Sequence, residues 1–131
     1  MLSAAMLLGP ACGSAPTRDA PTRDEPLRRA GFRSLAAREL VASCPGSAGR
    51  FDFAYQASRH DELKQLAART GAGTALSLGE NEWAGVSRVA RPEPCGPGEV
   101  AYSEGLVAYR AALDTLAARI ADHPAQQERR P

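Results

Sequence analysis

His60 is the side chain of this sequence best suited to acid–base chemistry, because imidazole titrates near neutral pH. It directly precedes Asp61 and Glu62 within a stretch of helical pattern. An imidazole beside carboxylates could act as a general base or as a ligand. The simpler interpretation, which we favour, is a half-buried histidine that is hydrogen-bonded to a backbone carbonyl or a carboxylate.

Glu80 and Glu82 form an acidic pair next to Trp83, the single tryptophan of the chain. An aromatic ring beside carboxylates could line a small-molecule pocket, and paired acids at the right separation could hydrolyse a glycoside. One hypothesis is therefore a ligand pocket formed by His60, Glu82 and Trp83. The simpler alternative is that Glu80 caps a helix and Trp83 belongs to the core.

Neither stretch matches a catalytic, metal or cofactor motif. His60 and His123 have no Cys, His or carboxylate partner three or four residues away, which makes a metal site unfavourable. The glycines at 71–73 lack the lysine and hydroxyl residue of a phosphate-binding loop. We therefore expect no catalytic, metal or cofactor-binding residues and no cofactor, and a protein that is not an enzyme.

The charge pattern argues against nucleic acid as a partner. The chain has 16 basic and 15 acidic residues, and its formal net charge is +1. Its arginines are scattered along the sequence, whereas phosphate backbones are bound by a basic patch or stripe.

Three cysteines, Cys12, Cys44 and Cys95, predict one disulfide bond in an exported protein. A lipidated or removed Cys12 cannot pair, which leaves Cys44 and Cys95 to pair in an oxidising compartment. That bond closes a loop of about 50 residues and contributes roughly 4 kcal/mol in the chain-entropy model. The alternative is a cytosolic protein in which both thiols are free.

The first 12 residues have the pattern of an export leader. Residues 1–8 form an apolar run that is too short to cross a bilayer but fits the central part of a secretory signal. No charged side chain precedes Arg18, so we expect the true start to lie upstream. Residues 9–12 resemble a bacterial lipoprotein cleavage site, which implies lipidation of Cys12. Cleavage after Ala15 and simple secretion are the alternative.

The remaining chain divides into three parts. Residues 13–26 contain a tandem Ala-Pro-Thr-Arg-Asp repeat, which cannot bury a core and is typical of an extended tether. An unstructured tail without a role is the alternative. Residues 27–124 are the expected folded domain, and residues 125–131 are the expected disordered tail.

The domain is expected to be all-α, because alanine is abundant and apolar residues recur at helical spacing. We predict helices over residues 28–43, 52–69, 78–90 and 99–122. The last is the clearest, because its apolar side chains alternate steps of four and three residues: Tyr102, Leu106, Tyr109, Leu113, Leu116 and Ile120.

The third segment is the most ambiguous of the four. Ser77 and Glu80 could form a capping box at its start, whereas Gly79 and Gly85 weaken a helix. A strand over residues 84–89 is one rival, and an irregular crossing between three helices is another.

Short connections favour a small up-down bundle of three to four helices. In that topology Cys44, at the end of the first helix, and Cys95, before the last helix, lie at the same end of the bundle. The predicted disulfide and the predicted topology therefore agree.

These features favour an exported, envelope-tethered interaction or structural module. We expect it in the periplasm or at the outer membrane as a lipoprotein, or secreted, with a protein partner and membrane contact only through the lipid anchor. If the partner docks on aromatic side chains, Tyr102, Tyr109 or Trp83 should be unusually exposed. The alternatives are a small-ligand-binding or hydrolase-like protein that uses the predicted pocket, and a cytosolic helical regulator with free thiols.

Overall fold

The computed structural model describes residues 15–124, with side chains from residue 23 onward. Over this range the regular elements are α1 (Ala15–Ala42), the short 3-10 helix η2 (Ser47–Gly49), α2 (Phe51–Arg69), α3 (Gly73–Ala90) and α4 (Gly98–Asp122). The described residues contain no strand. The prediction of an all-helical domain is confirmed, and so is its fourth helix to within one residue.

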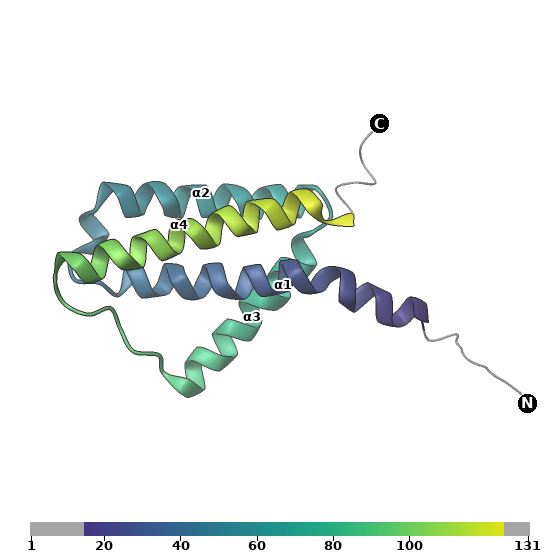
Figure 1. The fold of residues 1–131 in the computed structure, drawn as a ribbon, viewed down its shortest axis with the longest axis horizontal. Helices are drawn as coiled ribbons and strands as arrows, with labels where there is room; N and C mark the ends of the chain where they lie inside the picture. The colour runs from purple at the N-terminus through teal and green to yellow at the C-terminus, as the bar shows by residue number, and fades with distance from the viewer. Residues whose placement is uncertain (1–14, 125–131) are drawn as a thin grey trace, which may run out of the picture.

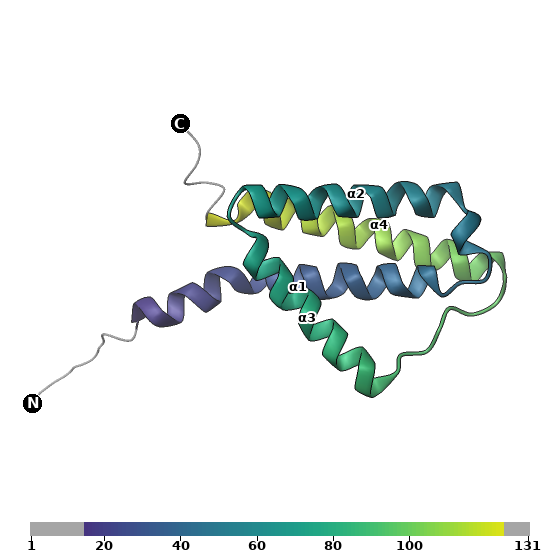
Figure 2. The same ribbon diagram turned by 180° about the vertical axis from the view of Figure 1, so that it is seen from behind.

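Helices α1, α2 and α4 lie side by side, and α3 crosses α1. Figures 1 and 2 show α2 and α4 running in the direction opposite to α1, while α3 crosses α1 obliquely. The tertiary contacts of α3 are mainly with α1 rather than with α2. The fold is thus a layer of α1, α2 and α4 with α3 packed on one side of α1.

The core face of α4 follows the predicted spacing. Tyr109, Leu113, Leu116 and Ile120 are fully buried, and Tyr102 is 3% exposed. The exposure that docking of a partner on the tyrosines would require is therefore not found. Both rings occupy core positions because their hydroxyl groups find partners across the helix interfaces, which removes the cost of burying them.

The start of α3 differs from its prediction. The helix begins at Gly73, five residues before the predicted start, and its N-cap residue Ala72 makes no side-chain hydrogen bond. The predicted capping box of Ser77 and Glu80 is therefore wrong, because both residues lie inside the helix. The strand over residues 84–89 is also wrong, since that stretch is helical.

α1 starts earlier than the predicted helix over residues 28–43. The helix begins at Ala15, within the segment for which the sequence predicts an extended tether. Leu27, near the middle of the helix, is 1% exposed, and the carboxylate of Asp24 lies 2.8 Å from Nε2 of His123, just beyond α4. Tertiary contacts therefore extend the domain to at least Asp24. The predicted leader (1–12), with Cys12, and the tail (125–131) lie outside the described residues.

Candidate functional site

An apolar groove with Trp83 in its wall lies between α1, α3 and residues 91–97. It encloses about 450 Å³, and we call it the Trp83 groove. Its lining residues come from three segments: Ala36, Ala37, Glu39 and Leu40 of α1 with Ser43 just after it, Trp83 and Ser87 of α3, and Pro92, Glu93 and Pro94 of the connection to α4. Its volume is within the range of ordinary ligand sites.

Trp83 is held in the groove wall by two contacts. Its indole Nε1 donates a hydrogen bond of 2.8 Å to Oε1 of Glu39. Its ring meets Phe32 edge-on, with ring centroids 5.5 Å apart and planes at 84°. These contacts, one polar and one aromatic, fix the orientation of a half-buried side chain and leave part of its surface for the groove.

The groove exists because α3 diverges from α1 after a close crossing. An ideal Cβ on Gly79 would lie 1.8 Å from the carbonyl oxygen of Arg28, so the two backbones touch at this point. Val86 lies seven residues further, on the same face of α3, yet it is 47% exposed. Beyond Trp83, the side of α3 that faces α1 is therefore no longer buried against it. Figure 2 shows the two helices diverging.

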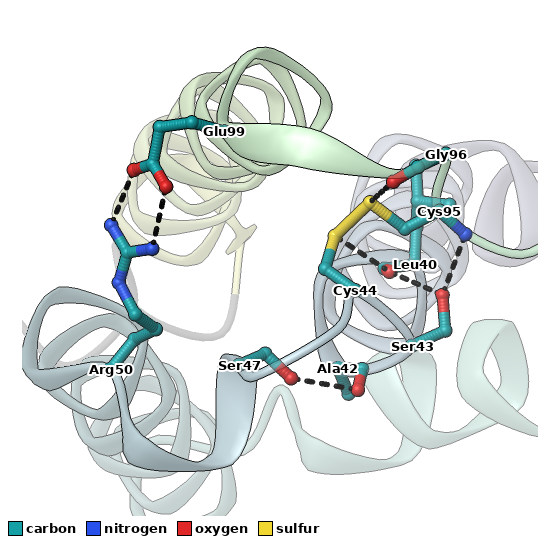
Figure 3. Close-up of a disulfide and its surroundings, with 9 residues drawn as sticks. All are labelled: Leu40, Ala42, Ser43, Cys44, Ser47, Arg50, Cys95, Gly96 and Glu99. Carbon is teal, nitrogen blue, oxygen red and sulfur yellow. Dashed lines mark hydrogen bonds and ion pairs between the residues drawn. A yellow bond between two sulfur atoms is a disulfide. The ribbon is translucent and has the colours of Figure 1, made fainter.

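The disulfide bond fixes the third side of the groove. Cys44 and Cys95 are bonded, with their Cα atoms 4.7 Å apart. The hydroxyl of Ser43 accepts a hydrogen bond of 2.9 Å from the backbone N–H of Cys95 and donates one of 2.6 Å to the carbonyl of Leu40 (Figure 3). Both links tie the connection that carries Pro92 and Pro94 to the end of α1.

Ion pairing strengthens the same end of the bundle. Arg50, at the start of α2, binds both carboxylate oxygens of Glu99 on α4, at 3.1 and 2.8 Å (Figure 3). Its guanidinium also lies 4.0 Å from the ring centroid of Tyr102, whose hydroxyl donates a hydrogen bond to Asp52. Burial and this hydrogen bond raise the pKa of Tyr102 to about 12. The phenol therefore stays a neutral donor at physiological pH.

His60 lies in the core, away from the Trp83 groove. Its side chain has no solvent-exposed surface, and its Nδ1 is 2.8 Å from the hydroxyl of Tyr109 on α4 and 3.4 Å from a guanidinium nitrogen of Arg38 on α1. Burial, and next the positive charge of Arg38, lower the pKa of His60 to about 4. The imidazole is thus a neutral link among α1, α2 and α4.

This link predicts loss of stability in mild acid. The unfolded chain binds a proton at His60 near pH 6.5, whereas the folded chain binds it only near pH 4. The stabilisation is therefore complete above pH 6.5 and is lost as the pH falls towards 4, by about 2 kcal/mol at pH 5. Urea unfolding at pH 7.5 and pH 5 measures this slope, and His60→Gln should flatten it.

An NMR titration of the His60 ring provides the direct check. The ring signals should stay at their neutral positions down to pH 5 in the folded protein. A midpoint near pH 6.5 would contradict the assignment of a buried neutral imidazole. Carboxylates with lowered pKa values, such as Asp61 beside Arg38, lose their stabilisation at lower pH, because they bind protons only below about pH 4.

The three residues of the predicted pocket have separate partners. His60 bonds Tyr109, Glu82 forms an ion pair with Arg28, and only Trp83 lines the groove. Glu82 and Trp83 are consecutive on α3, so their side chains project about 100° apart. The carboxylate that Trp83 meets belongs to Glu39, which the sequence reasoning did not select. No sequence signal pointed to Glu39, because its meeting with Trp83 depends on how α1 and α3 pack.

The described part of the chain contains neither a metal-binding cluster nor a membrane-spanning helix. No cluster of three or more His, Cys, Asp or Glu side chains there could hold a metal ion. No helix within residues 15–124 combines the length and apolarity that a membrane span requires. Comparison with known protein families, curated proteins and solved structures finds no significant match. Inference about function therefore rests on the geometry above.

Proposed function

We propose that this protein is an exported, envelope-tethered binding module that uses the Trp83 groove to recognise a protein partner. The observation that carries the proposal is an apolar groove with an oriented tryptophan in its wall and a disulfide-anchored third side. Tryptophan is enriched among residues that dominate binding energy, and a rigid groove lowers the ordering cost of association. No catalytic constellation accompanies the groove in the described residues.

The charges of the groove indicate the chemistry of its partner. Glu39 and Glu93 are the charged residues of its lining, and both are exposed. Apolar walls with a carboxylate rim complement a segment that combines Leu-like and Arg-like side chains. We therefore assign the groove to a short extended segment of an envelope protein in which apolar and basic residues alternate.

Export is supported by the disulfide bond. Structural disulfides form and persist in oxidising compartments, and Cys44 is 3% exposed within the core. Lipidation of Cys12 and location at the envelope remain predictions from the leader sequence. Intact mass of unreduced protein from an envelope fraction tests them together, since a diacylglyceryl group adds mass to Cys12 and the disulfide removes two hydrogens.

Trp83 provides the test of the binding site, because it is the only tryptophan of the chain. The probe is a synthetic peptide of alternating leucine and arginine, titrated against the oxidised protein while Trp83 fluorescence is followed. We expect a saturable blue shift, because the peptide excludes water from the indole. A peptide with glutamate in place of arginine should bind at least tenfold more weakly.

A pair of matched variants locates the effect. Leu40 lies in the groove and is 39% exposed, whereas Val107 is 61% exposed on α4, outside it. Leu40→Asp should weaken binding of the Leu/Arg peptide at least tenfold, and Val107→Asp less than twofold. Equal affinity for both peptides, or equal loss in both variants, would refute the assignment of this groove.

A small-molecule ligand is the second candidate, and the groove volume of about 450 Å³ favours it. The same fluorescence titration with benzyltrimethylammonium, an aromatic cation, separates the two candidates. Saturable binding of this cation tighter than that of the Leu/Arg peptide would favour the small ligand.

A further inference from the structure

A second groove gathers three arginines from two helices. It lies between α1 and α4 and encloses about 420 Å³. Arg29 and Arg33 of α1 and Arg119 of α4 line it, with alanines between them. We call it the arginine groove. Figure 1 shows α1 and α4 antiparallel, so the middle of α1 lies beside the last half of α4, and the first turns of α1 extend beyond it.

The positive charge of this groove is poorly compensated. No acidic residue is among its lining residues. Arg29 pairs with Glu25 at 3.1 Å, but that carboxylate also binds Arg28. Among the residues whose side chains are described, neither Arg33 nor Arg119 has an ion-pair partner. Arg29 and Arg33 are four residues apart on one helix, where like charges repel.

Two acidic residues of the flanking helices have partners outside the groove. Asp24 contacts His123, and Asp114 of α4 pairs with Arg59 of α2 at 2.6 Å. The positive charge of the three arginines is therefore left for an external anion to neutralise. Their guanidinium groups are planar forks that match two oxygens of a phosphate at once.

We infer that the arginine groove binds an organic phosphate. Arg29, Arg33 and Arg119 would contact the phosphate oxygens, and Thr115 offers a hydroxyl at the same groove. Ala30, Ala111 and Ala112 present apolar surface and leave room for the carbon part of the ligand. This site is independent of the Trp83 groove, because it uses α4 instead of α3.

The first experiment measures binding of sn-glycerol 3-phosphate to the oxidised full chain by calorimetry. A second arm measures cosedimentation with vesicles of phosphatidylglycerol and of phosphatidylcholine. Binding of the soluble compound indicates a free organic phosphate, whereas binding to phosphatidylglycerol vesicles alone indicates a lipid headgroup. Absence of binding in both arms would overturn the inference.

Charge-matched variants separate a specific site from general attraction. Arg33→Ala/Arg119→Ala removes two charges from the groove, and Arg88→Ala/Arg110→Ala removes two exposed charges outside it. The first double variant should bind at least tenfold more weakly, and the second less than twofold. Equal losses would overturn the inference, since they would report net charge only. Because all four side chains are exposed, unchanged thermal unfolding is expected for both variants.

Discussion

Replacing Gly79 by alanine should destabilise the fold by about 3 kcal/mol or more, even though alanine is the better helix former. A Cβ at this position would lie 1.8 Å from the carbonyl oxygen of Arg28 and 2.9 Å from the backbone nitrogen of Phe32. These are backbone atoms of α1, so no side-chain rotation relieves the clash. The helices must separate, which opens the α1–α3 interface.

Gly85 provides a matched control in the same helix. It lies in the interior of α3, but a Cβ there would meet nothing within 4 Å. Gly85→Ala should therefore stabilise the protein by up to about 1 kcal/mol through helix propensity alone. Chemical denaturation of both variants measures the contrast. If both substitutions shift stability in the same direction, the close crossing of α1 and α3 is not present in solution.

Removal of the disulfide bond should cost about 4 kcal/mol. Cys44 and Cys95 are separated by 51 positions, and opening a loop of this size releases that much chain entropy in the unfolded state. For a domain of this size the loss lowers Tm by at least about 15 °C. Thermal unfolding of Cys44→Ser/Cys95→Ser, followed by circular dichroism, tests the expectation.

The reduced wild-type protein is the natural control for that variant. Addition of a phosphine reductant should lower its Tm by a similar amount and leave the Tm of the double serine variant unchanged. Titration of unreduced, denatured protein with Ellman's reagent should detect no thiol from Cys44 or Cys95. Two reactive thiols in that titration would exclude the oxidised fold and remove the anchor of the Trp83 groove.

Local sequence patterns were sufficient to predict a helix that has a continuous apolar face. The spacing of Tyr102, Tyr109 and Leu113 predicted α4. The helix ends at Asp122, two residues before Pro124. The cysteine count predicted the disulfide, because elimination of Cys12 leaves one intramolecular pair. These predictions succeed because helix periodicity and pair counting depend on residues close in sequence or few in number.

Tertiary contact decided the features that local patterns misjudged. Gly79 weakens a helix by its intrinsic propensity, yet α3 passes through it because only glycine permits the backbone approach to Arg28. Asp24 of α1, which lies within the predicted tether, contacts His123 just beyond the end of α4. At Gly79, packing against α1 outweighs a helix-propensity cost of about 1 kcal/mol.

The candidate sites depended on the fold in the same way. The amino-acid sequence by itself determined that the described chain is helical and that two of its cysteines pair, and it made Trp83 a candidate for a binding residue. Only the tertiary structure decided that Trp83 contacts Glu39 instead of Glu82. It also decided that His60 is buried beside Tyr109, and that Arg33 and Arg119, 86 positions apart, line one groove. Each of these brings together residues of different helices. How helices cross is set by the packing of their side chains, which no single segment specifies.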